Sequence, residues 1–297
     1  MHLSPFFPAE PASAPIGEVW FTAEDNLTSI GKPLQSLLAE YPGMLGTGAD
    51  PKHPSLCPLL VKLLFTSDRL SVQVHPDDEY AAQHHQSLGK TEAWYVMDSQ
   101  PPGEVAIGFR DPITPERLES SARSGEIEQL LDWRKVSKGD LVFVPAGTVH
   151  AIGAGLTICE IQENSDITYR LYDYGRPREL HLKRGKEVST LTRYTQVSRT
   201  VELSPGRTQI ADCPYFRIER LAVPAQLRAK GQNDAYLLLV CLEGKGTIAD
   251  EPFAAGQVWF VPAQARGFVV DGPHSEWLLA YKADEPYAGL SLNSGIL

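Results

Sequence analysis

An internal repeat is the feature of this sequence that most limits its fold. Lys138–His150 reads KGDLVFVPAGTVH, and Ala255–Gly267 reads AGQVWFVPAQARG. The two segments align without a gap, 117 residues apart, with glycine matched to glycine and proline to proline. Each combines a turn glycine, four apolar residues and a proline, which ends a strand because its nitrogen cannot donate to a sheet. Two copies of this unit predict two similar β-barrels.

Short apolar runs broken by glycine and proline fill much of the chain and predict a mainly β protein. Examples are LLVKLLF, SVQVH and AWYVM early in the chain, and YLLLVCLEG and EWLLAYKA near its end. A helix is expected over Pro33–Glu40. Apolar residues recur near helical spacing between 111 and 136, at Ile127, Leu130, Leu131 and Val136, which predicts a small helical insert. We expect one domain over residues 1–200 and a second over 201–297.

Composition excludes several classes of partner. The formal net charge is −10, with 37 acidic and 27 basic residues, which argues against a face for nucleic acid or an anionic membrane. No run of 18 apolar residues occurs, and MHLSPFFPAEPASAP has no signal-peptide pattern, so we expect a cytoplasmic protein. The cysteines are far apart and are expected as buried thiols rather than disulfides or a thiolate zinc site: Cys57, Cys159, Cys213 and Cys241.

Four residues in the first half have the chemistry of a metal site. Gln73 and His75 are two apart on a predicted strand and so share a face. Glu92 begins the next strand, and His150 ends the first copy of the repeat. Each residue alone has an ordinary structural explanation. Together they suit one borderline divalent ion, zinc first, with manganese, iron, cobalt or nickel as alternatives. The second copy has Gly267 where the first has His150, so the second domain is expected to bind no metal.

These motifs resemble a known family. The repeat resembles the second conserved motif of the cupin superfamily, whose members are jelly-roll barrels. The strings SVQVHPDD, GKTEAWYV, VPAGTVHAIG and EIQENSDITYRLYDYGR resemble the short bacterial form of type I mannose-6-phosphate isomerases, from Gly17 to the C-terminus. The resemblance implies two cupin barrels, of which the first is catalytic. It also implies metal-dependent interconversion of mannose 6-phosphate and fructose 6-phosphate through a cis-enediol, a small-molecule sugar phosphate being the substrate.

The resemblance also implies roles for ionisable residues near the metal. Lys90 is expected on the strand face of Glu92, where a nearby cation would lower its pKa; it could transfer a proton, donate to a substrate oxygen or be a solvated turn residue. Glu160 is expected to pair with Arg170, an active-site cation in the family, or only to hold Arg170 in place. Asp166 matches a position implicated in opening the sugar ring.

The phosphate site is less defined, because the sequence contains no glycine-rich phosphate loop. Family position implies Ser71, Lys90, Arg170 and Arg176, although Arg176 could equally pair with Asp173. Two other functions stay open: a metal-bearing sugar-binding or regulatory cupin without turnover, and an oxygen-dependent oxidoreductase, which the glutamine at position 73 disfavours. We expect no nucleic-acid or membrane partner, and a monomer or a homodimer.

Overall fold

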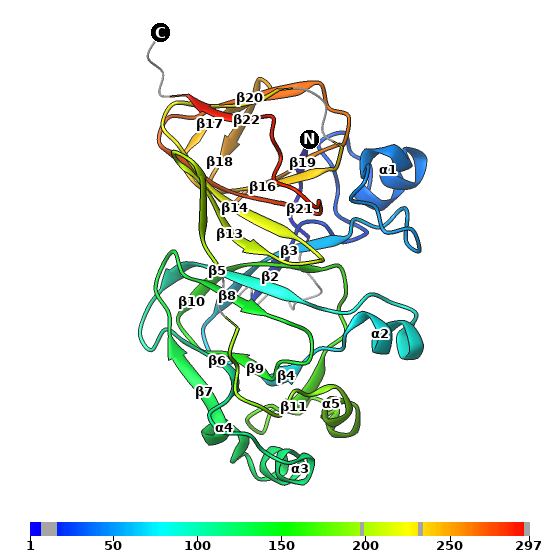
Figure 1. The fold of residues 1–297 in the computed structure, drawn as a ribbon, viewed down its shortest axis with the longest axis vertical. Helices are drawn as coiled ribbons and strands as arrows, with labels where there is room; N and C mark the ends of the chain where they lie inside the picture. The colour runs from blue at the N-terminus through cyan, green and yellow to red at the C-terminus, as the bar shows by residue number, and fades with distance from the viewer. Residues whose placement is uncertain (7–16, 197–198, 231–233, 294–297) are drawn as a thin grey trace. The chain divides into compact units, whose positions relative to one another are not determined.

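The computed structural model describes residues 1–6, 17–196, 199–230 and 234–293, which fall into two units (Figure 1). The central unit comprises Ala9–Val19 and Val61–Val197. The terminal unit comprises Met1–Pro8, Trp20–Leu60 and Ser198–Leu297. The predicted mainly β fold is confirmed, since the described residues form four sheets of paired antiparallel strands. In this part of the chain no helix is long and apolar enough to cross a membrane.

The central unit is built from two five-stranded sheets. One has the order β2-β3-β10-β5-β8 and the other β11-β4-β9-β6-β7. The strand bounds are β2 Glu18–Trp20, β3 Leu59–Thr66, β4 Val72–Val74, β5 Glu92–Ser99, β6 Glu104–Phe109, β7 Leu131–Lys135, β8 Leu141–Val144, β9 His150–Ile152, β10 Leu156–Glu163 and β11 Tyr169–Tyr172. Both sheets contribute to one core, a cluster of buried side chains that includes Trp94 and Ile158 from the first sheet and Ile107 and Ile152 from the second. The division between the units passes through β2 and β3.

Helices cover the outer face of the sheet β11-β4-β9-β6-β7 (Figure 1). Their bounds are α2 Asp78–His85, α3 Pro115–Ser124, α4 Ile127–Leu130 and α5 Leu182–Val188. The helical insert is confirmed but shorter than 111–136. Gly125 ends α3 with a φ of 84°, a left-handed conformation that glycine adopts without strain. Residues 131–135 form β7 instead of helix, because β6 offers them a partner strand with Ala106 opposite Trp133.

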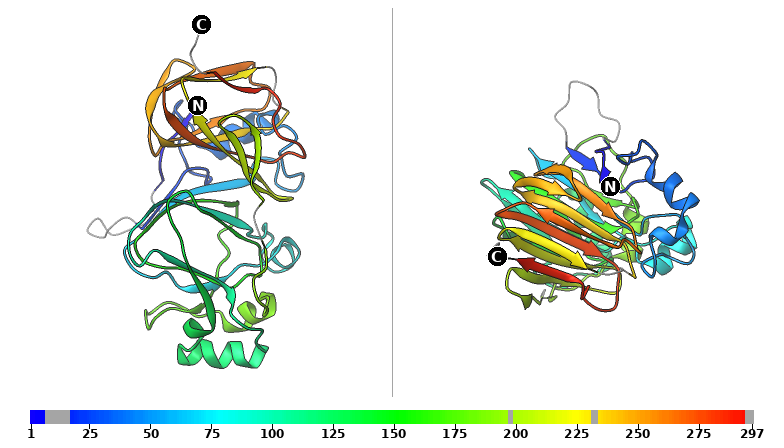
Figure 2. Two further views of the ribbon diagram at one scale, coloured as in Figure 1. Left: turned by 60° about the vertical axis from the view of Figure 1, so that its left-hand side comes forward. Right: turned by 90° about the horizontal axis from the view of Figure 1, so that it is seen from above.

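The terminal unit repeats the strand order of the central unit. Its sheets run β1-β19-β16-β21-β14-β13-β12 and β18-β17-β20-β15-β22, so β13–β22 take the places of β2–β11 in the same sequence of neighbours. Figure 2 (right) shows strands of this unit side by side. The bounds are β1 His2–Leu3, β12 Val201–Ser204, β13 Arg207–Asp212, β14 Arg217–Val223, β15 Gln226–Lys230, β16 Leu237–Glu243, β17 Lys245–Ile248, β18 Glu251–Ala254, β19 Val258–Val261, β20 Gly267–Asp271, β21 Ser275–Tyr281 and β22 Leu290–Asn293. The sequence repeat is therefore also a repeat of topology.

The N-terminal residues 20–60 belong with the C-terminal strands, which differs from a single division near residue 200. β1 pairs with β19, and the backbone N–H of Thr47 donates to the carbonyl of Asp234 at 2.7 Å. This segment includes α1 (Leu34–Glu40), which matches the predicted helix, and a short 3-10 turn, Pro42–Met44. Long-range pairing of backbone groups assigns it to this unit.

Trp277 provides a test of the core of the terminal unit. Its ring is fully buried and lies 4.6 Å from the ring of Phe253, centroid to centroid. We expect Trp277→Ala to lower the free energy of unfolding by about 3–5 kcal/mol, because it leaves a cavity in a close-packed core. Val201→Ala, on an exposed edge strand, should change it by less than about 0.5 kcal/mol. Denaturant titration followed by circular dichroism measures both, and equal effects would contradict this assignment of the core.

Candidate active site

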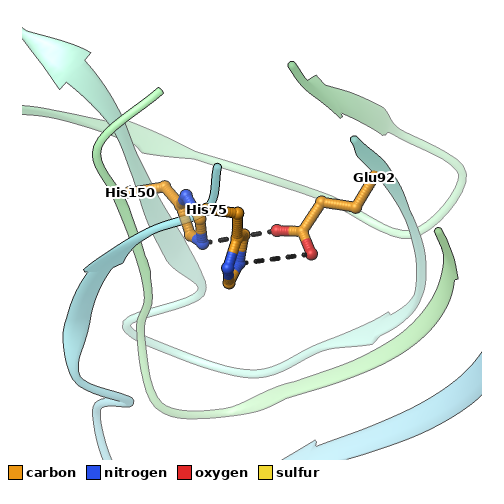
Figure 3. Close-up of side chains that lie close together, drawn as sticks. All are labelled: His75, Glu92 and His150. Carbon is orange, nitrogen blue, oxygen red and sulfur yellow. Dashed lines mark ion pairs between the residues drawn. The ribbon is translucent and has the colours of Figure 1, made fainter. Parts of the chain in front are cut away.

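Three buried side chains of the central unit converge on one point (Figure 3). His75 follows β4, Glu92 begins β5 and His150 begins β9. His75 Nε2 lies 3.6 Å from Glu92 Oε2, and His150 Nε2 lies 3.3 Å from Glu92 Oε1. Their potential ligand atoms all lie within 4.8 Å of one another. The structure thus brings together three of the four residues predicted as metal ligands in one cluster.

Strand alternation explains how Gln73 comes to face this cluster. Val72 and Val74 of β4 point to the helix-covered outer face, so Gln73 and His75 point inward. Gln73 is paired directly with His150 across β4 and β9, and paired residues in adjacent strands share a face. The predicted position of Gln73 on the ligand face is consistent with this register.

Hydrogen bonds orient both imidazoles. His75 Nδ1 lies 2.9 Å from the carbonyl of Ile167, and His150 Nδ1 lies 2.8 Å from the carbonyl of Thr148. Because a carbonyl only accepts, each Nδ1 must carry the hydrogen, which leaves the lone pair on Nε2. The two Nε2 atoms are buried and have no hydrogen-bond partner within the described residues. This is the arrangement of metal-binding histidines, whose second nitrogen donates to a carbonyl.

Burial keeps the histidines neutral. It lowers the pKa of His150 to about 4 and the pKa of His75 well below its usual range. Lys90 adds to this effect through its charge. A neutral imidazole can bind a metal ion, whereas a protonated one cannot. The donor set and its orphaned nitrogens therefore fit a divalent metal ion.

A second cluster of charges lies beside the histidines. Lys90 Nζ is 3.3 Å from Glu92 Oε2 and 3.9 Å from Glu160 Oε1, and its side chain is buried, so it is no solvated turn lysine. Burial alone would lower the pKa of Lys90, but the carboxylates of Glu92 and Glu160 outweigh it and raise that pKa. A bound cation would act in the opposite direction, as the sequence-based expectation assumed.

Lys62 is a site residue that the sequence reasoning missed. It lies on β3, is buried, and places Nζ 3.9 Å from Glu160 Oε1 and 3.7 Å from Asp166 Oδ1. Burial and the nearby charge of Lys90 lower the pKa of Lys62. The sequence did contain a signal, since a lysine stands in the middle of the apolar run LLVKLLF. A charged residue there must find buried partners.

The expected pairing of Glu160 with Arg170 was wrong. Glu160 Oε2 accepts a hydrogen bond from Trp94 Nε1 at 3.0 Å, and Oε1 faces Lys62 and Lys90. No ion pair joins it to Arg170 within the described ranges. The physical reason is that Lys62 and Lys90 supply the cations beside Glu160, whereas the guanidinium of Arg170 donates to the carbonyl of Glu179.

Arg170 nevertheless faces the site, because it is paired with Gln73 across β11 and β4. Its NH1 donates to the carbonyl of Glu179 at 3.2 Å. Asp166 is exposed on one side and touches Lys62 on the other. Asp166 is exposed and Arg170 is partly buried.

Two of the predicted phosphate contacts, Ser71 and Arg176, have partners within the protein. Ser71 is buried, with Oγ 3.4 Å from Gln73 Oε1. Arg176 donates from Nε to Asp173 Oδ1 at 3.0 Å and from NH2 to the carbonyl of Arg69 at 2.9 Å. The alternative that Arg176 pairs with Asp173 is therefore what the structure contains.

A buried cluster of two histidines and a carboxylate inside a unit of antiparallel sheets defines a β protein equipped to bind a divalent metal. Comparison with known proteins gives the family. The family model for the catalytic domain of type I phosphomannose isomerase matches residues 5–112. The chain is 37% identical over 279 residues to mannose-6-phosphate isomerase ManA of Bacillus subtilis, with 86% of each chain covered. It therefore belongs to the type I phosphomannose isomerases.

Further relatives agree. The mannose-6-phosphate isomerase of Streptococcus mutans is 34% identical over 276 residues, covering 86% of this chain and 85% of that protein. The crystal structure of the mannose 6-phosphate isomerase from Bacillus subtilis matches with a TM-score of 0.83 at 28% identity, covering 94% of this chain and 98% of the other. The likeness thus extends over both units.

The neutral histidines predict a pH effect on stability. Unfolded His150 binds a proton near pH 6.5, whereas folded His150 does so only near pH 4. The unfolded state thus holds more protons between these values, so the free energy of unfolding should fall by about 3 kcal/mol as the pH drops from 6.5 to 4. His75 acts in the same direction. Denaturant titration of metal-stripped protein across this range measures the slope. The slope should flatten in His150→Gln, and an unchanged slope would count against the assignment.

Proposed function

We propose that this protein is an isomerase that interconverts mannose 6-phosphate and fructose 6-phosphate through a cis-enediol. The observation that carries the proposal is the convergence of His75, Glu92 and His150 beside the buried charges of Lys62, Lys90 and Glu160. Relatives named as mannose-6-phosphate isomerases over most of their length support the same substrate. An aldose–ketose isomerase needs a group that moves a proton between C1 and C2, and an electrophile for the oxygens.

The ligands of the metal would be His75, Glu92 and His150, with the amide oxygen of Gln73 as the fourth. When bound, a divalent ion supplies Lewis-acid stabilisation of the negative charge that develops on the substrate oxygen. Zinc is our first choice, because two imidazoles and a carboxylate suit it; manganese, iron, cobalt and nickel are the alternatives.

Lys62 and Lys90 have different proposed roles in the reaction. Burial and the charge of Lys90 lower the pKa of Lys62, so Lys62 is the better proton acceptor. Its contacts with Glu160 and Asp166 give that proton a route between carboxylates. In the metal-free protein Glu92 and Glu160 raise the pKa of Lys90. We therefore assign to Lys90 the donation of a hydrogen bond to a substrate oxygen.

The remaining predicted site residues bind and orient the sugar. We assign Arg170 to the reacting hydroxyls, because it faces the site through its pairing with Gln73. The exposed position of Asp166 beside Lys62 suits proton transfer during ring opening. Ser71, Lys90, Arg170 and Arg176 form the proposed phosphate set. In that set Arg176 acts from a position fixed by Asp173.

The finer description of the fold belongs to the same proposal. Each unit would be a cupin jelly-roll, which the matching strand orders of the two units support. Catalysis would be confined to the central unit, which leaves out residues 20–60 of the predicted 1–200 domain. The 201–297 region would bind no metal, since Gly267 stands where the first copy has His150. Cysteines that form no disulfide among the described residues suit the cytoplasm.

Metal removal tests the proposal directly. Protein stripped by a chelator should lose conversion of mannose 6-phosphate, measured by NMR, and added zinc or manganese should restore it. His150→Ala should lose both bound metal, measured by mass spectrometry, and activity, by at least ~100-fold.

The alternatives give other results in the same assays. Bound metal without turnover of any sugar phosphate would indicate a binding or regulatory cupin. Oxygen consumption with a candidate substrate would indicate an oxidoreductase. Full activity in the stripped protein would rule out the metal-dependent mechanism.

Lys62 gives a test of the proton transfer itself. Lys62→Met keeps the length of the side chain but cannot accept a proton, so kcat should fall by at least ~100-fold. Metal content should be unchanged, because Lys62 is not one of the proposed ligands. Lys183→Met, an exposed lysine on α5, serves as the control and should keep wild-type kcat. Wild-type kcat in Lys62→Met would remove Lys62 from the mechanism.

A further inference from the structure

The terminal unit contains a cavity of about 710 Å³, a volume typical of small-molecule sites. It is formed by the ends of β13, β14, β15, β16 and β21, by the loop 282–289, and by Thr47. None of these residues belongs to the central unit. The cavity is therefore separate from the site described above.

Strand register shows that this cavity occupies the counterpart of the active site. In the central unit Glu92 is paired with Val144 across β5 and β8. The sequence repeat matches Val144 with Val261, and Val261 is paired with Leu237 across β19 and β16. Leu237, which lines the cavity, thus takes the place of the carboxylate Glu92.

A second strand pairing also places a residue of this cavity at the position of an active-site residue. Gln73 is paired with His150, whose match in the repeat is Gly267. Gly267 is paired with Lys230, which also lines the cavity. Lys230 thus stands where Gln73 stands in the first unit. Metal-binding residues have been replaced by a glycine, a leucine and a lysine, but the hollow between the sheets is kept.

Arg217, at the start of β14, is a buried cationic residue that lines the cavity. Its side chain is buried, NH1 pairs with Gln209 and NH2 donates to the carbonyl of Asp284 at 3.0 Å. Asp212 lies 3.1 Å from NH2. Nε is buried and has no hydrogen-bond partner within the described residues. The guanidinium is nevertheless held by protein groups where it lines the cavity.

The charges around the cavity indicate the class of that ligand. Three cationic side chains line it, namely Arg217, Lys230 and Lys282, together with four carboxylates, namely Asp212, Asp234, Asp284 and Glu285. This mixture gives an anion such as phosphate no net attraction, yet it offers many donors and acceptors. Tyr287, which is partly exposed, adds aromatic surface. Polar groups of both signs beside an aromatic ring suit a neutral polyhydroxylated molecule.

We propose that the cavity of the terminal unit is a second binding site, which takes an uncharged hexose. The ligand hydroxyls accept from the ammonium groups of Lys230 and Lys282 and donate to the carboxylates that line the cavity. The terminal unit thus keeps the sugar-sized hollow of a duplicated barrel while binding its ligand without metal. This site does not depend on the isomerase reaction.

Titration of the full chain with D-mannose, followed by saturation-transfer NMR and calorimetry, tests the proposal. Ala288 is exposed and lines the cavity, so Ala288→Trp fills it and should weaken mannose binding at least tenfold. Ala255→Trp, the same change at an exposed position that does not line the cavity, should bind as the wild type does. Both variants should convert mannose 6-phosphate normally, because neither residue touches the active site.

Two further experiments test where mannose binds and whether the site takes an uncharged ligand. His150→Ala should keep mannose binding, since it alters only the central unit; loss of binding there would place mannose in the active site and overturn the proposal. Inorganic phosphate should not compete with mannose, and competition would overturn the assignment to an uncharged ligand. The second site would also be refuted if wild-type protein bound no mannose, or if Ala288→Trp bound it normally.

Discussion

A fully buried carboxylate is the constraint on which the central unit depends. Glu92 lies between two imidazole nitrogens and a lysine ammonium, at the point where β4, β5 and β9 meet. Burying such a charge costs several kcal/mol unless partners compensate it. The partners come from both sheets, so the sheets must close over the site for the charge to be tolerated. The same contacts therefore close the two sheets on each other and compensate the buried charge of Glu92.

The sequence predicted the parts of the site that follow from local patterns. Alternation along β4 placed Gln73 and His75 on one face, and the repeat anticipated the matching strand orders of the units. It could not predict which cations would lie beside Glu160, so it paired Glu160 with Arg170. Lys62 was overlooked for the same reason, since its partners Glu160 and Asp166 are about a hundred residues away.

The remaining differences between the predicted and the observed fold arise because segments far apart in the sequence pair with each other. The spacing of apolar residues near Leu131 is compatible with a helix or a strand. These residues form the strand β7 because β6 offers partners to their backbone groups. Residues 20–60 joined the terminal unit through hydrogen bonds to segments more than 180 residues away, such as that from Thr47 to Asp234. The pattern of residues along one sequence does not show which distant segments will pair with each other.

The pairing of Gln73 with His150 makes metal loading a reporter of folding fidelity. Because side chains alternate along a strand, a slip of β4 by one residue would turn Gln73 and His75 toward the helices and Val72 and Val74 toward the site. A molecule with that error could not assemble the proposed set of metal ligands. The fraction of chains that take up metal after refolding therefore counts those in which β4 found its correct neighbour, which makes a stoichiometric assay of the ion a measure of strand register.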